Sequence, residues 1–203
     1  MWKRGAGFDV QTYTGTDSNS SRSHGLGKVP EMIWVKRRDS TNDWAVYHKD
    51  LHQYPQDYYL VLNDSAAAVN ASQWWKPPTS THWFTAIGGL NNVNNAHYIA
   101  MLFASVAGIS KVGYYDGTGS GLTITTGFSP RFVILKRIDA SGNWYVLDTT
   151  RGWGSGNDKH IQLNETNSDS DFDFVAPTAT GFRLTVHNGY NGSCVKYIYY
   201  AHA

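Results

Sequence analysis

Residues 27–46 read GKVPEMIWVKRRDSTNDWAV, and residues 127–146 read GFSPRFVILKRIDASGNWYV. The two stretches align at a fixed offset of 100 positions and share seven of twenty residues. Chance alone would give roughly one identity, because even common residue types occur at only a few per cent each. The shared pairs are Gly27/Gly127, Pro30/Pro130, Lys36/Lys136, Arg37/Arg137, Asp39/Asp139, Trp44/Trp144 and Val46/Val146. A match of this quality at a fixed period indicates an internal repeat.

The repeat continues in both directions from this segment, with small shifts in register. VQTYTGT at residues 10–16 corresponds to VGYYDGT at 112–118, and residues 92–100 correspond to 191–199. The sequence therefore predicts a lead-in segment at residues 1–7, one unit over 8–109 and a second unit over 110–203. No flexible linker is evident between the two units.

Each unit reads as short strands separated by turns. An apolar run follows the shared proline in both units, at Met32–Val35 and at Phe132–Leu135. A polar turn and a Trp-containing run come next, which is the pattern of a β-hairpin. Residues 98–104 could form a helix, but the matching Tyr-Ile-Tyr-Tyr run at 197–200 is aromatic and β-branched and favours a strand. We expect an all-β fold of two tandem antiparallel β-sandwich units of about 100 residues each.

Composition excludes several classes of protein. Charged residues make up 16% of the chain, the net charge is +1, and the 8 Trp, 13 Tyr and 8 Phe favour strands over helices. This weak charge argues against a nucleic-acid binder. The single cysteine, Cys194, excludes an internal disulfide. No apolar run approaches the length of a membrane span, and the N-terminus lacks the apolar region of a signal peptide.

The second unit resembles a repeat domain of bacteriophage virion proteins, mostly of tail-fibre or tail-associated type. The residues that carry the resemblance are Tyr115-Asp116-Gly117, Gly127-Phe128-Ser129-Pro130, Lys136-Arg137, Trp144–Asp148, Arg151-Gly152, Leu163-Asn164, Gly181-Phe182, Asn191 and Tyr197-Ile198. The first unit departs from the pattern: Lys28 replaces the phenylalanine, His48 replaces the aspartate, and the Arg-Gly pair is absent. The resemblance implies a jelly-roll or concanavalin-like β-sandwich and a place on a phage particle.

The function that the resemblance implies is that of a virion structural protein, a tail-fibre module that binds the host surface or builds the fibre. One alternative is a capsid decoration protein that clamps neighbouring capsid subunits, and another is a carbohydrate-active enzyme on a sandwich fold. Its expected partners are other virion proteins, further copies of the chain (a trimer, by analogy with phage fibres) and a host surface glycan or protein. Its expected location is the exterior of the tail or capsid, after synthesis in the host cytoplasm, with neither nucleic-acid binding nor membrane insertion.

No catalytic constellation emerges from the sequence, so we expect no enzyme. Glycoside hydrolysis needs two carboxylates across a groove, yet Glu31 and Glu165 are the only glutamates and both lie at turn or strand-edge positions. The eight histidines are scattered, and the aspartates sit mostly in turns.

Aromatic residues are concentrated between Gln53 and Phe84. Within this stretch we single out Tyr54, Trp74, Trp75 and Trp83 as candidates for contact with a ligand or partner. Trp74 and Trp75 are adjacent, so on a strand they would point to opposite faces, one into the core and one outward. Such an exposed aromatic ring can stack on a sugar or anchor a protein contact. Packing in the core or against another subunit is the alternative.

Asp169, Asp171 and Asp173 place carboxylates at alternate positions. On a strand these side chains would share one face, where Ca²⁺ could relieve their repulsion. The alternative is a solvated loop. We expect no other cofactor and no other metal site.

Overall fold

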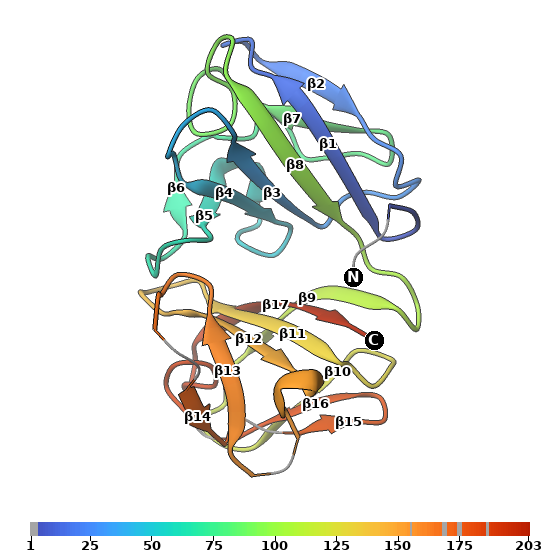
Figure 1. Cartoon of the computed structure of the whole chain (residues 1–203), viewed down its shortest axis with the longest axis vertical. Helices are drawn as coiled ribbons and strands as arrows, with labels where there is room; N and C mark the ends of the chain where they lie inside the picture. Colours follow the sequence, from blue (N-terminus) through green and yellow to red (C-terminus); the bar gives the residue numbers. More distant parts are fainter. Residues whose placement is uncertain (1–3, 155, 168–169, 174–175, 186) are drawn as a thin grey trace. The chain divides into compact units, whose positions relative to one another are not determined.

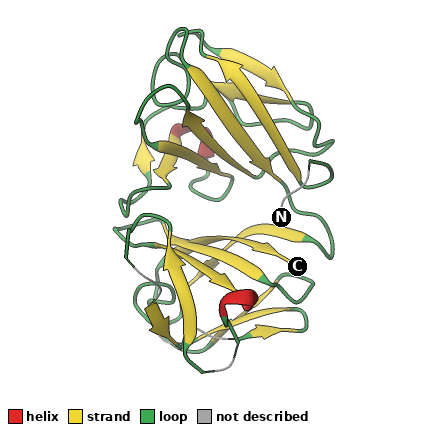
Figure 2. Cartoon of the chain, viewed as in Figure 1, coloured by secondary structure: helices red, strands yellow, loops and turns green. Residues whose placement is uncertain are grey.

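The computed structural model describes residues 4–154, 156–167, 170–173, 176–185 and 187–203. Its described part is all-β, with four antiparallel sheets and two single-turn 3₁₀ helices, η1 (Pro55–Asp57) and η2 (Thr149–Arg151) (Figures 1 and 2). The chain forms two compact units. One comprises Met1–Asn63 and Ala68–Ser105, and the other comprises Asp64–Ala67 and Val106–Ala203. We refer to them as unit 1 and unit 2.

Unit 1 contains one large and one small sheet. Its strands are β1 (Phe8–Thr14), β2 (Ser20–Ser23), β3 (Met32–Arg37), β4 (Trp44–His48), β5 (Tyr58–Val61), β6 (Val69–Asn70), β7 (His82–Thr85) and β8 (His97–Phe103). The large sheet has the order β1-β8-β3-β4-β5-β6, and β2 pairs with β7 in the small one. The strands β1 and β2 are therefore edge strands of different sheets.

Unit 2 repeats this arrangement. Its strands are β9 (Ser110–Asp116), β10 (Leu122–Thr125), β11 (Phe132–Arg137), β12 (Trp144–Asp148), β13 (Asp158–Gln162), β14 (Ser170–Phe172), β15 (Pro177–Thr178), β16 (Gly181–Leu184) and β17 (Lys196–His202). The large sheet has the order β14-β13-β12-β11-β17-β9, and the small one has the order β10-β16-β15. β9 and β10 thus occupy the edge positions that β1 and β2 hold in unit 1.

The secondary structure predicted around the repeated segment is confirmed. β3 pairs with β4, and β11 with β12, across the polar turn in each unit. The segment that could have been a helix is the strand β8, which pairs with both β1 and β3. Its equivalent β17 pairs with β9 and β11 in the same way. Each central strand therefore joins the first strand of its unit to the hairpin.

Each unit has its own apolar core, built largely from aromatic rings. In unit 1, Trp74, Trp83 and Tyr98 are among the largest fully buried side chains. A pair of stacked tyrosines recurs near the first strand: Tyr13 lies on Tyr98 at 4.9 Å between ring centroids, and Tyr115 lies on Tyr197 at 5.1 Å. Both pairs have planes 12° apart. Offset stacking of this kind adds to the free energy gained by burying the rings.

The Lys-Arg motif at the end of the central hairpin strand has a structural role in both units. Arg37 Nε donates to Asp39 Oδ1 at 2.5 Å, and Arg137 Nε donates to Asp139 Oδ1 at 2.7 Å. The preceding lysine donates from Nζ to the backbone oxygen of the arginine, at 2.7 Å in each unit. These contacts order the polar turn, so the recurrence of Lys-Arg in the sequence is explained without a ligand.

A fully buried asparagine in unit 1, Asn92, connects the loop after β1 to the loop before β8. Its Oδ1 accepts from the backbone N–H of Thr16 at 3.0 Å. Its Nδ2 donates to the backbone oxygens of Ser18 at 2.6 Å and Ala86 at 3.0 Å. Because buried polar groups need partners, these three hydrogen bonds make the burial of the Asn92 amide favourable and tie the loop after β1 to the loop between β7 and β8.

Asn191 does the same in unit 2. Its Oδ1 accepts from Thr118 N at 3.0 Å, and its Nδ2 donates to the backbone oxygens of Ser120 and Thr185 at 2.6 and 2.9 Å. Asn191 is also fully buried. The asparagine near the end of the sequence pattern, Asn92 in unit 1 and Asn191 in unit 2, is therefore a structural residue in both units.

Replacing either asparagine with alanine should destabilise its own unit. Asn191→Ala removes three hydrogen bonds to backbone groups from a fully buried position, and we expect the free energy of unfolding of unit 2 to fall by about 2–4 kcal/mol. Urea unfolding followed by tryptophan fluorescence measures this loss. Asn94→Ala, at an exposed asparagine, is the control and should change stability by less than about 0.5 kcal/mol. An equal effect of both substitutions would contradict the assigned role.

Candidate functional site

Two of the four aromatic residues singled out from the sequence lie in the core of unit 1. Trp74 is 2% exposed and Trp83 is 0% exposed. Trp74 Nε1 donates to the backbone oxygen of Tyr58, and Trp83 Nε1 donates to Oε1 of Gln11. Both side chains therefore serve packing, which was the alternative interpretation, and neither can contact a partner at the surface.

Trp75 and Tyr54 are exposed, at 40% and 56% respectively. Trp75 lies edge-to-face on Phe84 of β7, with 5.9 Å between centroids, and Lys76 Nζ lies 4.2 Å from the centroid of its indole ring. Tyr54 lies near His52 instead, at 6.0 Å. The ring of Trp75 thus contacts Phe84 and Lys76, whereas the ring of Tyr54 lies near His52.

The predicted inside–outside relationship of Trp74 and Trp75 is observed, but its predicted cause is wrong. Neither residue lies on a strand, because both belong to a bend between β6 and β7. A bend directs successive side chains apart as effectively as the pleat of a strand does. The indole of Trp75 therefore sits on a loop beside the small sheet.

The predicted acidic cluster of Asp169, Asp171 and Asp173 lies partly outside the described residues. Asp169 lies outside the described residues, whereas Asp171 belongs to β14 and Asp173 is exposed just after it. The backbone oxygen of Asp173 accepts from Thr185 Oγ1 at 2.9 Å. Within the described ranges no group of three or more His, Cys, Asp or Glu side chains could hold a metal ion.

Other titratable groups are engaged in the fold. Glu31 accepts from Lys49 Nζ at 2.6 Å and from the backbone N–H of Ser105. In unit 2 the structure brings together two histidines that are far apart in sequence. Burial and the nearby His160 lower the pKa of His187, whose ring stacks on Tyr190 at 4.6 Å. This arrangement keeps His187 neutral near pH 7 and favours aromatic packing.

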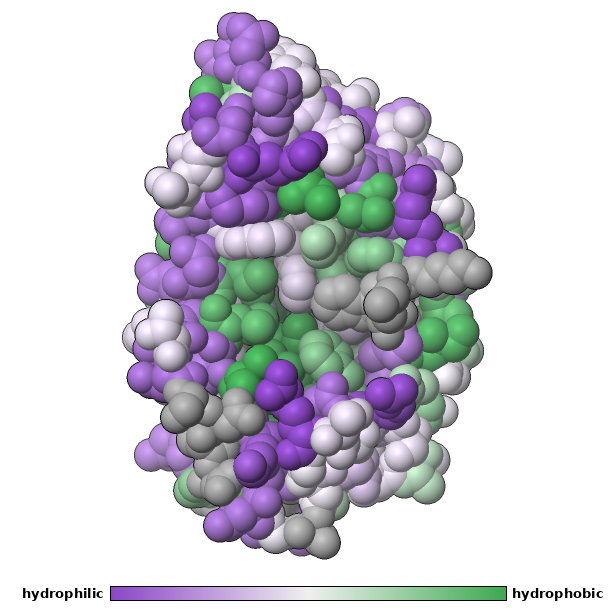
Figure 3. All heavy atoms as spheres, in the orientation of Figure 1, coloured by the Kyte–Doolittle hydropathy of each residue, from purple (hydrophilic) through white to green (hydrophobic). Residues whose placement is uncertain are grey.

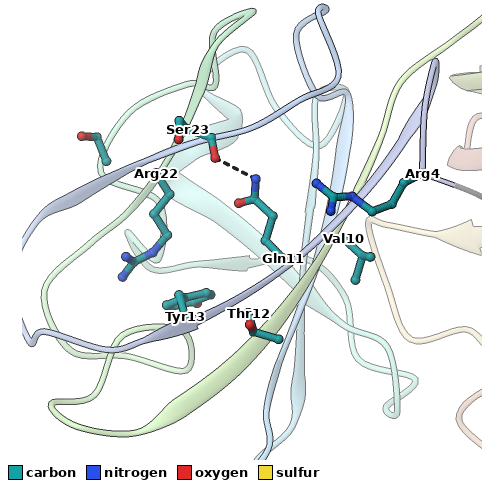
Figure 4. Close-up of a pocket in the computed structure, with 8 residues that line it drawn as sticks. Arg4, Val10, Gln11, Thr12, Tyr13, Arg22 and Ser23 are labelled. Atoms are coloured by element: carbon teal, nitrogen blue, oxygen red, sulfur yellow. Dashed lines mark hydrogen bonds between the residues drawn. The ribbon is translucent and has the colours of Figure 1, made fainter.

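A polar groove of ≈ 580 Å³ runs between the edge strands β1 and β2 of unit 1. Its lining residues are Arg4, Val10, Gln11, Thr12, Tyr13, Ser21, Arg22 and Ser23 (Figure 4). Val10 is the only aliphatic member of this set, and the others offer hydroxyl, amide, guanidinium or phenol groups. We call it the β1–β2 groove.

Alternation along β1 positions the polar groups of the groove. Asp9, Gln11 and Tyr13 share one face of the strand because side chains two residues apart point the same way. Gln11 Nε2 donates to the backbone oxygen of Ser23 at 2.7 Å, which links the two sheet edges (Figure 4). This hydrogen bond therefore holds the edges of β1 and β2 together within the groove.

At one end of the groove, Arg4 forms an ion pair with Asp9. Arg4 Nε donates to Asp9 Oδ1 at 2.7 Å, and Asp9 Oδ2 accepts from the backbone N–H of Gly25 at 3.0 Å. Burial raises the pKa of Asp9, but the hydrogen bonds from Gly25 and Arg4 outweigh this effect and hold it below its usual value. Asp9 is thus ionised at neutral pH and balances the charge of Arg4.

The other end of the groove carries the guanidinium of Arg22. It lies over the ring of Tyr13, 3.9 Å from the centroid, and its Nη2 donates to Asn92 Oδ1 at 3.1 Å. The buried Nε of Arg22 has no hydrogen-bond partner in the described part of the chain. Tyr13 in turn donates to the backbone oxygen of Asn91 at 2.5 Å and stacks on Tyr98. The guanidinium is therefore held in a defined place by rigid core residues.

Unit 2 fills the equivalent region with apolar side chains. Register places Ile124 opposite Phe182, as Arg22 is opposite Trp83 in unit 1. Gly113 lies opposite Tyr199, where unit 1 has Gln11 opposite Ala100. Ile124, Phe182 and Tyr199 all belong to the core of unit 2. The polar character of this edge is therefore specific to unit 1.

Hydrophilic residues also cover the end of unit 1 where the loop between β1 and β2 lies, drawn uppermost in Figure 3. Sequence analysis did not find the groove, although a signal was present. Positions 11 and 22 are among those at which the two repeats differ, as Gln/Gly and Arg/Ile, and a repeat comparison that weighs mismatches as well as identities would have marked them.

A family model described as "Domain of unknown function (DUF7483)" matches residues 3–203, and so includes both units. The comparisons with curated proteins and with solved structures found no match. No helix among the described residues is long and apolar enough to cross a membrane.

The placement of the adjacent tryptophans predicts opposite responses to truncation. Trp74→Ala should lower the free energy of unfolding of unit 1 by about 3–5 kcal/mol, because it empties a buried site and removes the donor to Tyr58. Trp75→Ala should cost less than about 1 kcal/mol, because the side chain is largely at the surface. Urea unfolding of the two variants measures the difference, and similar losses would show that Trp75 also belongs to the core.

Proposed function

The chain belongs to the DUF7483 family, and on that premise we propose that it is a non-catalytic binding module of a bacteriophage particle, of tail-fibre type, that contacts the host surface. Its two units are concanavalin-like β-sandwiches that act as rigid supports. Contact residues lie on loops and strand edges, where substitutions leave the core unchanged. Repetition of the module on the particle would convert modest single-site affinity into firm attachment.

The observation that carries this proposal is the supported and exposed indole of Trp75. Phe84 holds one edge of the ring, and the ammonium group of Lys76 lies beside it. A rigid ring of this kind binds with a small loss of conformational entropy, which is why tryptophan contributes strongly at binding surfaces. A flat apolar ring beside a cation suits a surface that presents both sugar faces and negative charge.

The disposition of the acidic groups supports a binding role over a catalytic one. Glu31 is engaged by Lys49 and Ser105, and Asp9 by Arg4 and Gly25. Carboxylates held this way have low pKa values and are poor general acids near neutral pH. The β1–β2 groove contributes guanidinium, amide and hydroxyl groups, which suit recognition.

Binding to cells provides the test of this function. The purified chain, fluorescently labelled, should bind the bacteria that the parent particle infects, and Trp75→Ala should weaken binding by about tenfold or more. Tyr114→Ala is the matched control in unit 2, because Tyr114 is 50% exposed and has Lys196 Nζ 4.4 Å from its ring centroid. This control should bind like the wild type.

Locating the chain on intact particles separates the proposal from its rival. Cryo-electron microscopy with a labelled antibody against the chain should place it at the tail periphery. Density that bridges capsid subunits, together with absent cell binding, would instead identify a decoration protein. Loss of binding in both Trp75→Ala and Tyr114→Ala would mean that the contact is not specific to unit 1.

A further inference from the structure

We propose that the β1–β2 groove of unit 1 is a binding site for an acidic saccharide, in which Arg22 receives a carboxylate and the surrounding hydroxyl and amide groups receive the sugar. This inference rests on the proposed surface-binding function and names the chemical class of its ligand. It concerns residues different from the exposed indole that carries the general proposal.

The guanidinium of Arg22 has no carboxylate partner among the described residues. Arg4 is paired with Asp9, but Arg22 takes part in no ion pair in the described ranges of the chain. Its half-buried guanidinium is held by a ring face, an amide oxygen and no carboxylate. Partly burying an unpaired charge is unfavourable, and burial lowers the pKa of Arg22. A ligand carboxylate would supply the missing negative charge with a charge-assisted hydrogen bond.

Unit 2 has no charged side chain at the position equivalent to Arg22. The equivalent of Arg22 is Ile124, which packs in the core of unit 2 at 6% exposure. The same position in unit 2 therefore accommodates an apolar side chain. Unit 1 instead places a guanidinium there and fixes it by stacking on Tyr13.

Most of the other residues that line the groove carry neutral polar groups. Thr12, Ser21 and Ser23 are exposed and line the groove at its rim. They alternate along β1 and β2 with the inward-facing Gln11, Tyr13 and Arg22, so their hydroxyl groups lie on the opposite strand faces. A cation inside the groove with an amide beside it and hydroxyl groups along the rim suits a hydroxyl-rich ligand that carries one acid group per sugar. A simple inorganic anion would use the guanidinium and leave most of these groups unused.

An extended peptide fits the groove less well. Peptides add to sheet edges through free backbone groups, but the backbone oxygen of Ser23 is already bound by Gln11 and the N–H of Gly25 by Asp9. The side chains of β1 thus cap the edge of β2. With Val10 as its single aliphatic lining residue, the groove also lacks the apolar pockets that anchor peptide side chains.

The path of a longer saccharide is suggested by the register of the small sheet. Ser21 of β2 lies directly opposite Phe84 of β7, and Phe84 supports the indole of Trp75. Ser21 lines the groove. A chain of several sugars that enters the groove could therefore cross β2 and reach the ring of Trp75.

Isothermal titration with defined oligosaccharides tests the site. The probes are an oligogalacturonate, a maltooligosaccharide of the same length as the neutral control, and an oligoglutamate as the acidic peptide control. We expect the oligogalacturonate to bind best, with affinity that falls as salt is raised. Arg22→Gln should weaken this binding about tenfold or more, because a charge-assisted contact is lost.

Two further variants keep the test independent of folding. Ser21→Glu adds a carboxylate at an exposed position of the groove and should also abolish binding, without a change in the unfolding transition. Arg183→Gln removes an exposed arginine from β16 of unit 2 and should leave binding unchanged. Equal binding of the neutral probe, equal binding of oligoglutamate, or full binding by Arg22→Gln or Ser21→Glu would each overturn the proposal.

The outcomes also separate this inference from the general function. If the wild-type chain binds cells but none of the oligosaccharides, the saccharide site is wrong and surface binding stands. If oligogalacturonate binds in the groove but cells are not bound, the site stands and the host-surface function is wrong.

Discussion

In each unit one fully buried asparagine side chain makes three hydrogen bonds to backbone groups of the surrounding loops. Asn92 and Asn191 each accept from the loop after the first strand and donate twice to backbone carbonyls. The loops must then lie close together, and they do so where glycine is present. A Cβ at Gly15 would collide with the carbonyl oxygen of Val93, and one at Gly117 with that of Gly192. The same loop bonds the stacked tyrosines of unit 1, because Tyr13 donates to the backbone oxygen of Asn91 and Tyr98 accepts from the backbone N–H of Val93.

The two units share this internal framework but differ at the edges of their sheets. The strand order, the hairpin with its Arg–Asp pair and the stacked tyrosines are common to both units. Between β1 and β2, however, unit 1 has charge and hydrogen-bonding groups, whereas unit 2 has an extension of its core. Duplication thus yields one unit with a polar edge and another with a closed one on the same scaffold. The family model includes both, so the pair is the unit that the family describes.

Much of the fold could be predicted from the sequence, because several residues that the two repeats share are the ones that form the common strands and turns. The hairpin and the strand β8 follow from comparing the two halves. The candidate contact residues were harder to predict, because aromatic content does not distinguish a core ring from an exposed one. Trp74 and Trp75 differ only by a bend that no local pattern marks. The groove depends on Gln11 and Arg22, which are differences between the repeats and so are not found by a search for identities.

At the edge of the large sheet, the larger side chain of a cross-strand pair lies on the first strand in unit 1 and on the neighbouring strand in unit 2. Unit 1 pairs Gln11 with Ala100, and unit 2 pairs Gly113 with Tyr199. A Cβ on Gly113 would lie 2.7 Å from the tyrosine hydroxyl, so a side chain on β9 and the ring on β17 exclude one another. Neither unit can acquire the other's edge by a single substitution, since the first change alone produces either a collision or a void. The two edges are therefore coupled pairs of residues, and each pair must be exchanged as a whole to convert one kind of edge into the other without strain or underpacking.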